Sequence, residues 1–212
     1  MPPQTEPSRT APPVEVRRRQ QRDDACRAIL DATESILVDE GYERFSMRKL
    51  AARCGYTAPT IYHYFGDKPG LFDALLELRG AGLVAELEAE RLGRDPVENM
   101  RILCSSFARF GLRNPAHYRL MMTPRPNAEP LVSGERAQAL LQAPIQRLHA
   151  EGRLVFDDLD TAIQAFWGLL HGLISLHHSR PDVEWKDDIV SNALDALIRG
   201  SLRTPDGCAS GS

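Results

Sequence analysis

The sequence has no long apolar segment and few residues that could form covalent or metal cross-links. No window approaches the roughly eighteen consecutive apolar residues of a membrane-spanning helix, and the N-terminal stretch lacks the apolar core of a secretory signal. We therefore expect a cytoplasmic protein without a membrane partner. The cysteines lie far apart and form no CxxC pair, which favours reduced thiols over a disulfide framework or a zinc site: Cys26, Cys54, Cys104 and Cys208.

Catalytic motifs are missing as well. The sequence contains no GxSxG, no HExxH and no cysteine with an evident base, and no segment has the alternating pattern of a β-strand. We therefore expect neither an enzyme activity nor a cofactor. His171, His177 and His178 raise the question of a metal site, but they span two helical turns without a matching carboxylate, so a histidine in a pocket or an interface is the favoured interpretation.

What is present is typical of a globular helical protein. The 212 residues, 42% hydrophobic and 26% charged, suit one domain, or a small domain joined to a larger one. Apolar positions recur at spacings of three and four, which predicts an all-α fold of about nine helices. Disordered tails are expected over 1–22, which is rich in proline and arginine, and over 205–212. The basic run "RRRQQR" within the first tail is either an arm that contacts DNA or a solvated segment.

Local signals predict where the helices begin and end. The first is expected from Asp23 to Gly41, and the next two begin at the capping residues Ser46 and Thr57. Pro144 is expected to kink or break a helix over 131–152. The last helix is expected over 184–202.

The segment "YTAPTIYHYFGDK" concentrates aromatic residues in a chain that is only 7% aromatic. Together with the preceding helix it forms two short helices joined by the turn "CGYT", which is a helix-turn-helix pattern. Ile61 and Phe65 are four residues apart and should face inward, leaving a polar surface suited to phosphates and base edges that consists of Thr57, Ala58, Thr60, His63 and Tyr64. Between Arg44 and Lys68 five cations face one anion, although the whole chain has a net charge of -3, so this segment is expected to meet a polyanion.

The stretch "FSMRKLAARCGYTAPTIYHYFGDKPGLFDALL" resembles the DNA-binding domain of the tetracycline-repressor (TetR) family of bacterial regulators, and the likeness extends from residue 24 to about 76. The resemblance implies a DNA-binding domain over 23–80 and a helical domain for ligand binding and dimerisation over 81–204. It also implies contacts with DNA bases, sugars or phosphates by Arg48, Thr57, Ala58, Pro59, Thr60, Tyr62, His63, Tyr64 and Lys68.

Near the C-terminus, "AFWGLLHGLISLHH" places small residues at helical spacing, on a face that a second helix can approach closely: Ala165, Gly168, Gly172 and Ser175. The Trp-to-His-Gly run resembles one subgroup of TetR ligand domains. This resemblance implies a homodimer formed by the last two helices, with a second set of contacts from Val190, Ala193, Leu194 and Leu197.

The sequence thus predicts a homodimeric, ligand-responsive transcription regulator, acting as a repressor that binds a palindromic operator and is released by a small hydrophobic effector. Large, adaptable or polar-tipped side chains of the middle helices are candidates to line the effector pocket: Phe107, Phe110, Tyr118, Met121, Met122, Phe166, Trp167 and His171. The alternative is a helical small-molecule-binding protein or an enzyme that uses the helix-turn-helix only as scaffold.

Overall fold

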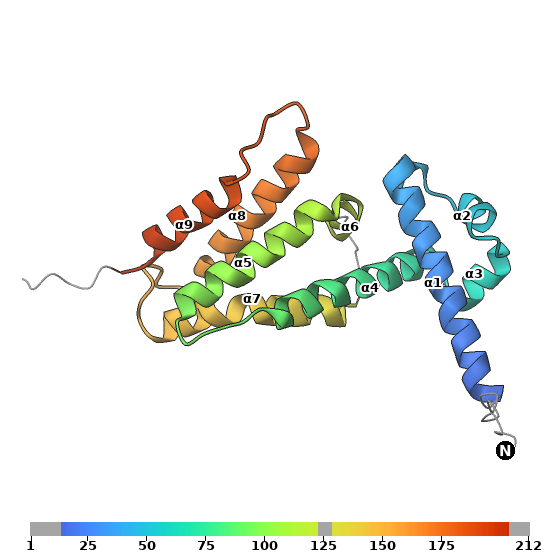
Figure 1. Ribbon diagram of the computed structural model, residues 1–212, viewed down its shortest axis with the longest axis horizontal. Helices are drawn as coiled ribbons and strands as arrows, with labels where there is room; N and C mark the ends of the chain where they lie inside the picture. The colour runs from blue at the N-terminus through green and yellow to red at the C-terminus, as the bar shows by residue number, and fades with distance from the viewer. Residues whose placement is uncertain (1–13, 123–128, 204–212) are drawn as a thin grey trace, which may run out of the picture. The chain divides into compact units, whose positions relative to one another are not determined.

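The structure, a computed structural model, describes residues 14–122 and 129–203, and the fold of these residues is all-α (Figure 1). The prediction of about nine helices is confirmed, because the described residues contain nine α-helices and one short 3₁₀ helix. They are α1 (Val14–Glu40), η1 (Tyr42–Arg44), α2 (Met47–Cys54), α3 (Ala58–Phe65), α4 (Lys68–Ala89), α5 (Pro96–Arg113), α6 (Pro115–Met121), α7 (Val132–Ala150), α8 (Leu159–Ser179) and α9 (Ile189–Ser201). The expected tail over 205–212 lies outside the described residues.

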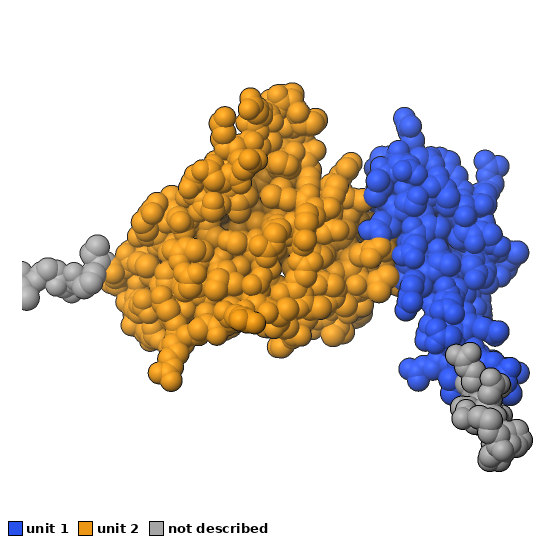
Figure 2. Space-filling view, in the orientation of Figure 1, with its two compact units in different colours: residues 1–71 blue, residues 72–212 orange. Residues whose placement is uncertain are grey.

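The chain divides into two compact units, Met1–Leu71 and Phe72–Ser212 (Figure 2). In the first unit α1 packs against η1 and α2, and α2 packs against α3. The predicted caps are present: the Ser46 side chain accepts a hydrogen bond from the Lys49 amide at 3.3 Å, and Thr57 caps α3 in the same way. Gly55 ends α2 with φ +74°, a left-handed conformation that glycine adopts without strain. These caps fix the turn between α2 and α3.

Helix α1 begins at Val14, so the prediction that residues 14–22 belong to a disordered tail is wrong. The side chains of this segment are all exposed, and no packing against a core holds it in place. Arginine, glutamine and glutamate are good helix formers, which lets the polar run continue the helix that the buried part of α1 already nucleates. Residues 1–13 lie outside the described part of the chain.

In the second unit, α5 is the central helix and contacts α6, α7, α8 and α9 (Figure 1). Pro144 was expected to kink or break this helix, and it does not break it, because α7 continues through Pro144. Pro144 is buried where α7 packs along α5 and α8, and this packing compensates for the single backbone hydrogen bond that a proline removes. The last helix begins at Ile189 instead of Glu184, because the preceding residues form turns in which the Trp185 indole donates to the Arg180 carbonyl at 3.2 Å.

Helices α4 and α7 approach closely at Gly80. A β-carbon there would lie 2.1 Å from the Ser133 Oγ, whereas one at Gly82 on the same helix would meet no atom within 4 Å. The Ser133 amide donates to the Glu77 carboxylate at 3.0 Å, which holds the two helices together. The contact therefore requires glycine at Gly80 but not at Gly82.

This difference predicts opposite effects for the same substitution on one helix. Gly82→Ala should raise the free energy of unfolding by about 0.5–1 kcal/mol, because alanine is the better helix former. Gly80→Ala should lower it by about 1–3 kcal/mol, because α4 and α7 must move apart. Urea unfolding of both variants measures the difference, and a shift in the same direction for both would contradict the close approach.

Candidate DNA-binding surface and ligand cavity

Helix α3 has one anchor and a broad outward surface. The Ile61 side chain is completely buried, whereas Tyr62 is 45% exposed and His63 is also exposed. Tyr64 is half-buried, with its ring 5.5 Å from the His63 ring. The aromatic-rich segment is therefore mostly surface rather than core, as its predicted role requires.

Thr57 and Thr60 are hydrogen-bonded to each other. Their hydroxyl oxygens lie 2.8 Å apart, and the Thr57 oxygen also accepts from the Thr60 amide at 3.3 Å. One hydroxyl must donate to the other, so the pair keeps one O–H for a further acceptor. The N-terminus of α3 thus offers a fixed hydroxyl donor beside Ala58 and the exposed Pro59.

The five cations of the segment are not equivalent. Lys49 pairs with Glu40, and an Arg53 guanidinium nitrogen lies 3.0 Å from an Asp39 oxygen, so acids of α1 neutralise two of the charges that the sequence assigned to a basic patch. Arg48 is exposed and forms no ion pair within the described ranges. Arg48 is thus better placed than Lys49 or Arg53 to meet an anion.

Lys68 lies at the start of α4, against two aromatic rings. Its Nζ is 4.7 Å from the centre of the Tyr42 ring and 5.4 Å from that of Phe45. Such cation–π contacts orient an ammonium over the faces of the rings. The structure therefore holds the Lys68 charge close to the N-terminal end of a helix, where anions are favoured.

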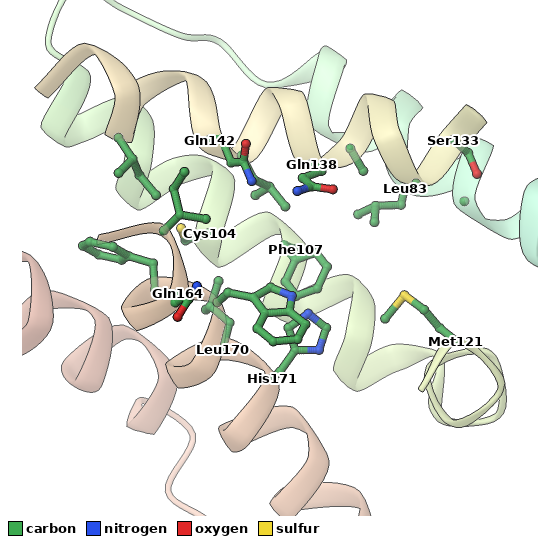
Figure 3. A pocket seen from close by; sticks show the side chains of 18 of the residues that line it. Leu83, Cys104, Phe107, Met121, Ser133, Gln138, Gln142, Gln164, Leu170 and His171 are labelled. Carbon is green, nitrogen blue, oxygen red and sulfur yellow. The ribbon is translucent and has the colours of Figure 1, made fainter. Parts of the chain in front are cut away.

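The second unit contains a cavity of about 740 Å³, a volume suited to a small organic ligand. Six of the eight predicted pocket residues line it: Phe107, Met121, Met122, Phe166, Trp167 and His171. Figure 3 shows Phe107 and His171 on one side of the space and Gln138 and Gln142 extending from α7 on another. The cavity therefore has a mixed aromatic and polar wall.

Phe110 and Tyr118 do not line the cavity, and these two predictions are corrected. Phe110 packs edge-on against His117 with ring centres 5.8 Å apart, and the Tyr118 hydroxyl lies 2.8 Å from His171 Nδ1. Tyr118 thus orients the cavity residue His171 by a hydrogen bond, without lining the cavity itself. Sequence reasoning missed the walls formed by α4 and α7, with Leu76, Gly80, Leu83, Ser133, Ala137, Gln138, Leu141, Gln142, Ile145 and Gln146.

Three titratable groups of the cavity wall, His171, His117 and Cys104, have pKa values shifted toward their neutral forms. Burial lowers the pKa of His171 to about 4, and burial together with the charge of Arg79 lowers the pKa of His117 to about 4. Burial also raises the pKa of the Cys104 thiol to about 12. His117 is only 6% exposed, and its Nδ1 has no hydrogen-bond partner in the described structure.

His117 should make the protein less stable as the pH falls. Between its pKa of about 4 in the folded state and the ordinary value of 6.5, only the unfolded chain takes up the proton. Stability is therefore lost on acidification through this window, by about 1–2 kcal/mol between pH 7 and pH 5. His171, whose pKa is also about 4, acts in the same direction. His117→Phe removes one of the two titrating groups and should reduce the dependence of the urea midpoint on pH by about half, and an unchanged slope would contradict this assignment.

The predicted dimer surface is partly exposed. Gly168 and Ser175 are exposed, and Ala165, Gly172, Val190, Ala193 and Leu197 are half-buried. Leu194 is completely buried in the core of its own subunit, so its assignment to a dimer interface is wrong. The helical spacing of α9 identified an apolar face but could not show that Leu194 is covered by α5 and α8 rather than by a second subunit.

The three histidines of α8 do not converge. His171 meets Tyr118, His178 Nε2 lies 3.0 Å from the Gly111 carbonyl oxygen, and the His177 ring is 6.1 Å from the Trp185 ring. Over residues 14–122 and 129–203 no group of three His, Cys, Asp or Glu side chains is placed to hold a metal ion. Within the same ranges no helix is long and apolar enough to cross a membrane.

Two family models match the chain. Residues 29–75 match bacterial regulatory proteins of the tetR family, and residues 100–200 match a tetracyclin repressor-like C-terminal domain. The first match covers the helix-turn-helix, and the second runs from within α5 through α6, α7 and α8 to the end of α9.

Individual proteins of known role are also similar. The chain is 29% identical over 115 residues to the HTH-type transcriptional activator FasR of Mycolicibacterium smegmatis, spanning 54% of this chain and 52% of FasR, about half its length. It is 25% identical over 179 residues to the HTH-type transcriptional repressor BepR of Brucella suis, spanning 82% of this chain and 77% of BepR.

Solved structures share the fold. The TetR family transcriptional regulator PfmR of Thermus thermophilus superposes with a TM-score of 0.65 at 25% identity, covering 81% of this chain and 97% of PfmR. These similar proteins are transcription regulators, which favours a regulator over the alternative of a helical small-molecule-binding protein or an enzyme that uses the helix-turn-helix only as scaffold.

Proposed function

The chain belongs to the tetR family of bacterial regulatory proteins, and we propose on this basis that it is a DNA-binding transcription regulator that responds to a small ligand. The observation that carries the proposal is the separation of two kinds of site. One unit presents α2 and α3 with an outward surface of hydroxyls, rings and the exposed Arg48, and the other encloses a cavity of about 740 Å³.

Within this proposal, the N-terminal part of α3 lies in the major groove and Arg48, the Thr57–Thr60 pair and Lys68 hold phosphates or base edges. Tyr62, His63 and Tyr64 add contacts to the backbone, and Ala58 and Pro59 approach the base or sugar edges. All the residues that the sequence predicted to contact DNA therefore belong to the proposed DNA-binding surface. Arg53 and Lys49 are left out because acids of α1 neutralise them.

The regulator acts as a homodimer through α8 and α9. The small side chains at Ala165, Gly168, Gly172 and Ser175 permit close approach of a second copy, and a β-carbon at either glycine would meet no atom of its own subunit within 4 Å. A two-fold dimer presents two recognition helices about 34–36 Å apart, so the operator is palindromic.

The sense of regulation is repression, relieved by the ligand. BepR is named a repressor and FasR an activator, so relatives of both kinds exist. Repression requires that the ligand prefer a conformation with lower operator affinity. A difference in ligand affinity of about 1–3 kcal/mol between the two conformations weakens DNA binding about 5- to 150-fold.

A gel-shift assay with DNA that flanks the coding region of the protein tests the proposal. We expect a retarded complex with two subunits per DNA duplex, weakened by added salt because lysine and arginine contacts release counterions. Shuffled DNA of the same composition serves as the control. Absence of a retarded complex at low salt, with protein that sediments as a dimer, would refute the DNA-binding function.

A further inference from the structure

The described walls of the cavity contain almost no charge. Their lining includes no lysine and no arginine, and one carboxylate, Asp160, in the first turn of α8. His117, His171 and Cys104 are the other ionisable groups of the lining, and their shifted pKa values keep all three neutral near pH 7. Arg79 acts on His117 but is not part of the described lining. An anionic ligand would thus lose its hydration without gaining a cationic partner in the described lining, and Asp160 would repel it.

Uncharged amides replace the missing charges. Gln138, Gln142 and Gln146 follow one another at intervals of four residues, so they form a row with steps of ~6 Å and a length of ~12 Å along α7. Gln164 of α8 adds a fourth amide, and Figure 3 shows it across the space from Gln142. None of the four side chains has a hydrogen-bond partner within the described part of the protein; Gln142 is half-buried, and the other three are exposed. Each amide offers a donor and an acceptor to a ligand.

The remaining walls supply aromatic rings. Phe107 and Trp167 flank His171, with ring centres 5.3 Å and 4.8 Å from that of the histidine. Trp167 is 58% exposed, an unusual state for an indole beside a cavity. His117 also belongs to the lining, but its unpartnered Nδ1 is buried within the protein, where an unused hydrogen-bonding group costs stability.

We infer that this cavity binds an uncharged, elongated molecule with a flat, ring-containing apolar body and with hydroxyl, carbonyl or amide groups along one edge. The edge lies against the glutamine row of α7, and the body lies against Phe107, Trp167 and His171. Carboxylates, phosphates and sulfonates of the same shape are rejected. The inference rests on the proposed ligand-responsive function and specifies the chemistry of its ligand.

Two probes with the same skeleton test the charge rule. Phenylnaphthylamine is neutral, and anilinonaphthalenesulfonate adds one sulfonate. The chain has two tryptophans, so Trp185→Phe leaves Trp167 as the sole donor for energy transfer to a probe in the cavity. In this variant we expect the neutral probe to bind at least about tenfold more tightly than the sulfonate, since nothing compensates the buried charge.

A cation placed in the glutamine row should reverse the preference. Gln142→Arg should tighten sulfonate binding by about tenfold or more, because the guanidinium pairs with the anion. Gln164→Lys places a cation on the opposite wall and should act in the same direction. Gln21→Arg makes the same change on exposed α1 and should leave both affinities unchanged. Circular dichroism confirms that each variant is folded.

Competition tests the polar edge. A naphthalenediol should displace phenylnaphthylamine at about 3- to 10-fold lower concentration than naphthalene, as expected for one or two hydrogen bonds to the row. Equal potency of the two competitors would overturn the assigned polar edge.

Tighter binding of the sulfonate by the starting protein, or no energy transfer from Trp167 with either probe, would overturn the inference as a whole. The gel shift is performed without any probe. Retained DNA binding alongside such a result would reject only the ligand chemistry, whereas loss of DNA binding would speak against the proposed function itself.

Discussion

Replacing Gly172 by leucine should give a folded subunit that no longer dimerises and binds the operator at least about 100-fold more weakly. A β-carbon at Gly172 meets no atom of its own chain within 4 Å, so a side chain can begin there without a clash inside the subunit. In the proposed dimer the same side chain enters a close contact between helices and overpacks it. The second half-site is then no longer bound intramolecularly, and such linkage contributes about 10²- to 10⁴-fold to affinity.

Sedimentation gives the mass of the variant, a gel shift its affinity for the operator, and thermal unfolding the integrity of the fold. Gly82→Leu is the matched control, because Gly82 also lies in a helix with no atom near its missing β-carbon but on α4, away from α8 and α9. The control should remain dimeric. A Gly172→Leu variant that stays dimeric and keeps its operator affinity would remove α8 from the interface.

The sequence predicted best those features that depend on neighbours along the chain. Ser46 and Thr57 cap α2 and α3, and Gly55 ends α2, because each acts on backbone groups within four residues. The inward position of Ile61 followed from helical spacing in the same way. Short-range chemistry therefore predicted the turn that presents α3.

Charge was predicted less well, because ion pairs join residues that are distant in sequence. Arg53 meets Asp39, which lies on α1, outside the segment that suggested a basic patch. The composition of a segment counts the arginine but not its partner. Which cations are neutralised becomes visible only when α1 is packed on α2: Lys49 and Arg53 then meet acids of α1, and Arg48 does not.

The cavity could be predicted only in part for a related reason. Phe107 and Trp167 suggested a pocket by their type, whereas nothing in the sequence pattern assigned a role to the glutamines of α7. Whether a polar row meets bulk water or a hollow depends on how α4, α5, α7 and α8 leave space between them. Leu194 was misassigned for the same reason. Its apolar position on α9 packs in the core of its own subunit instead of against a partner subunit.

Reversing the charge of Arg48 should weaken operator binding by about 100-fold or more without loss of stability. Arg48 is exposed on α2 and has no ion pair in the described part of the molecule, so Arg48→Glu breaks no contact that holds the fold. A dimer carries two copies, and each loses a contact worth about 1–2 kcal/mol and gains a repulsion from the phosphates. A gel shift at several salt concentrations measures the effect.

The control removes a cation that the structure shows to be neutralised. Arg53→Ala combined with Asp39→Ala deletes an exposed ion pair at constant net charge, so we expect the affinity to stay within about threefold of the starting protein. Equal losses for the double variant and for Arg48→Glu would mean that the ion pairs do not distinguish these arginines.

The milder Arg48→Ala then identifies the partner of the side chain on DNA. If Arg48 contacts a phosphate in each half-site, affinity for operator and shuffled DNA falls alike, and the slope of log affinity against log salt decreases by about 2. If it contacts a base, affinity falls for the operator alone and discrimination at one position of each half-site relaxes. An alanine variant that binds both DNAs as tightly as the starting protein would exclude Arg48 from the interface and leave the Thr57–Thr60 pair and Lys68 as its anchors.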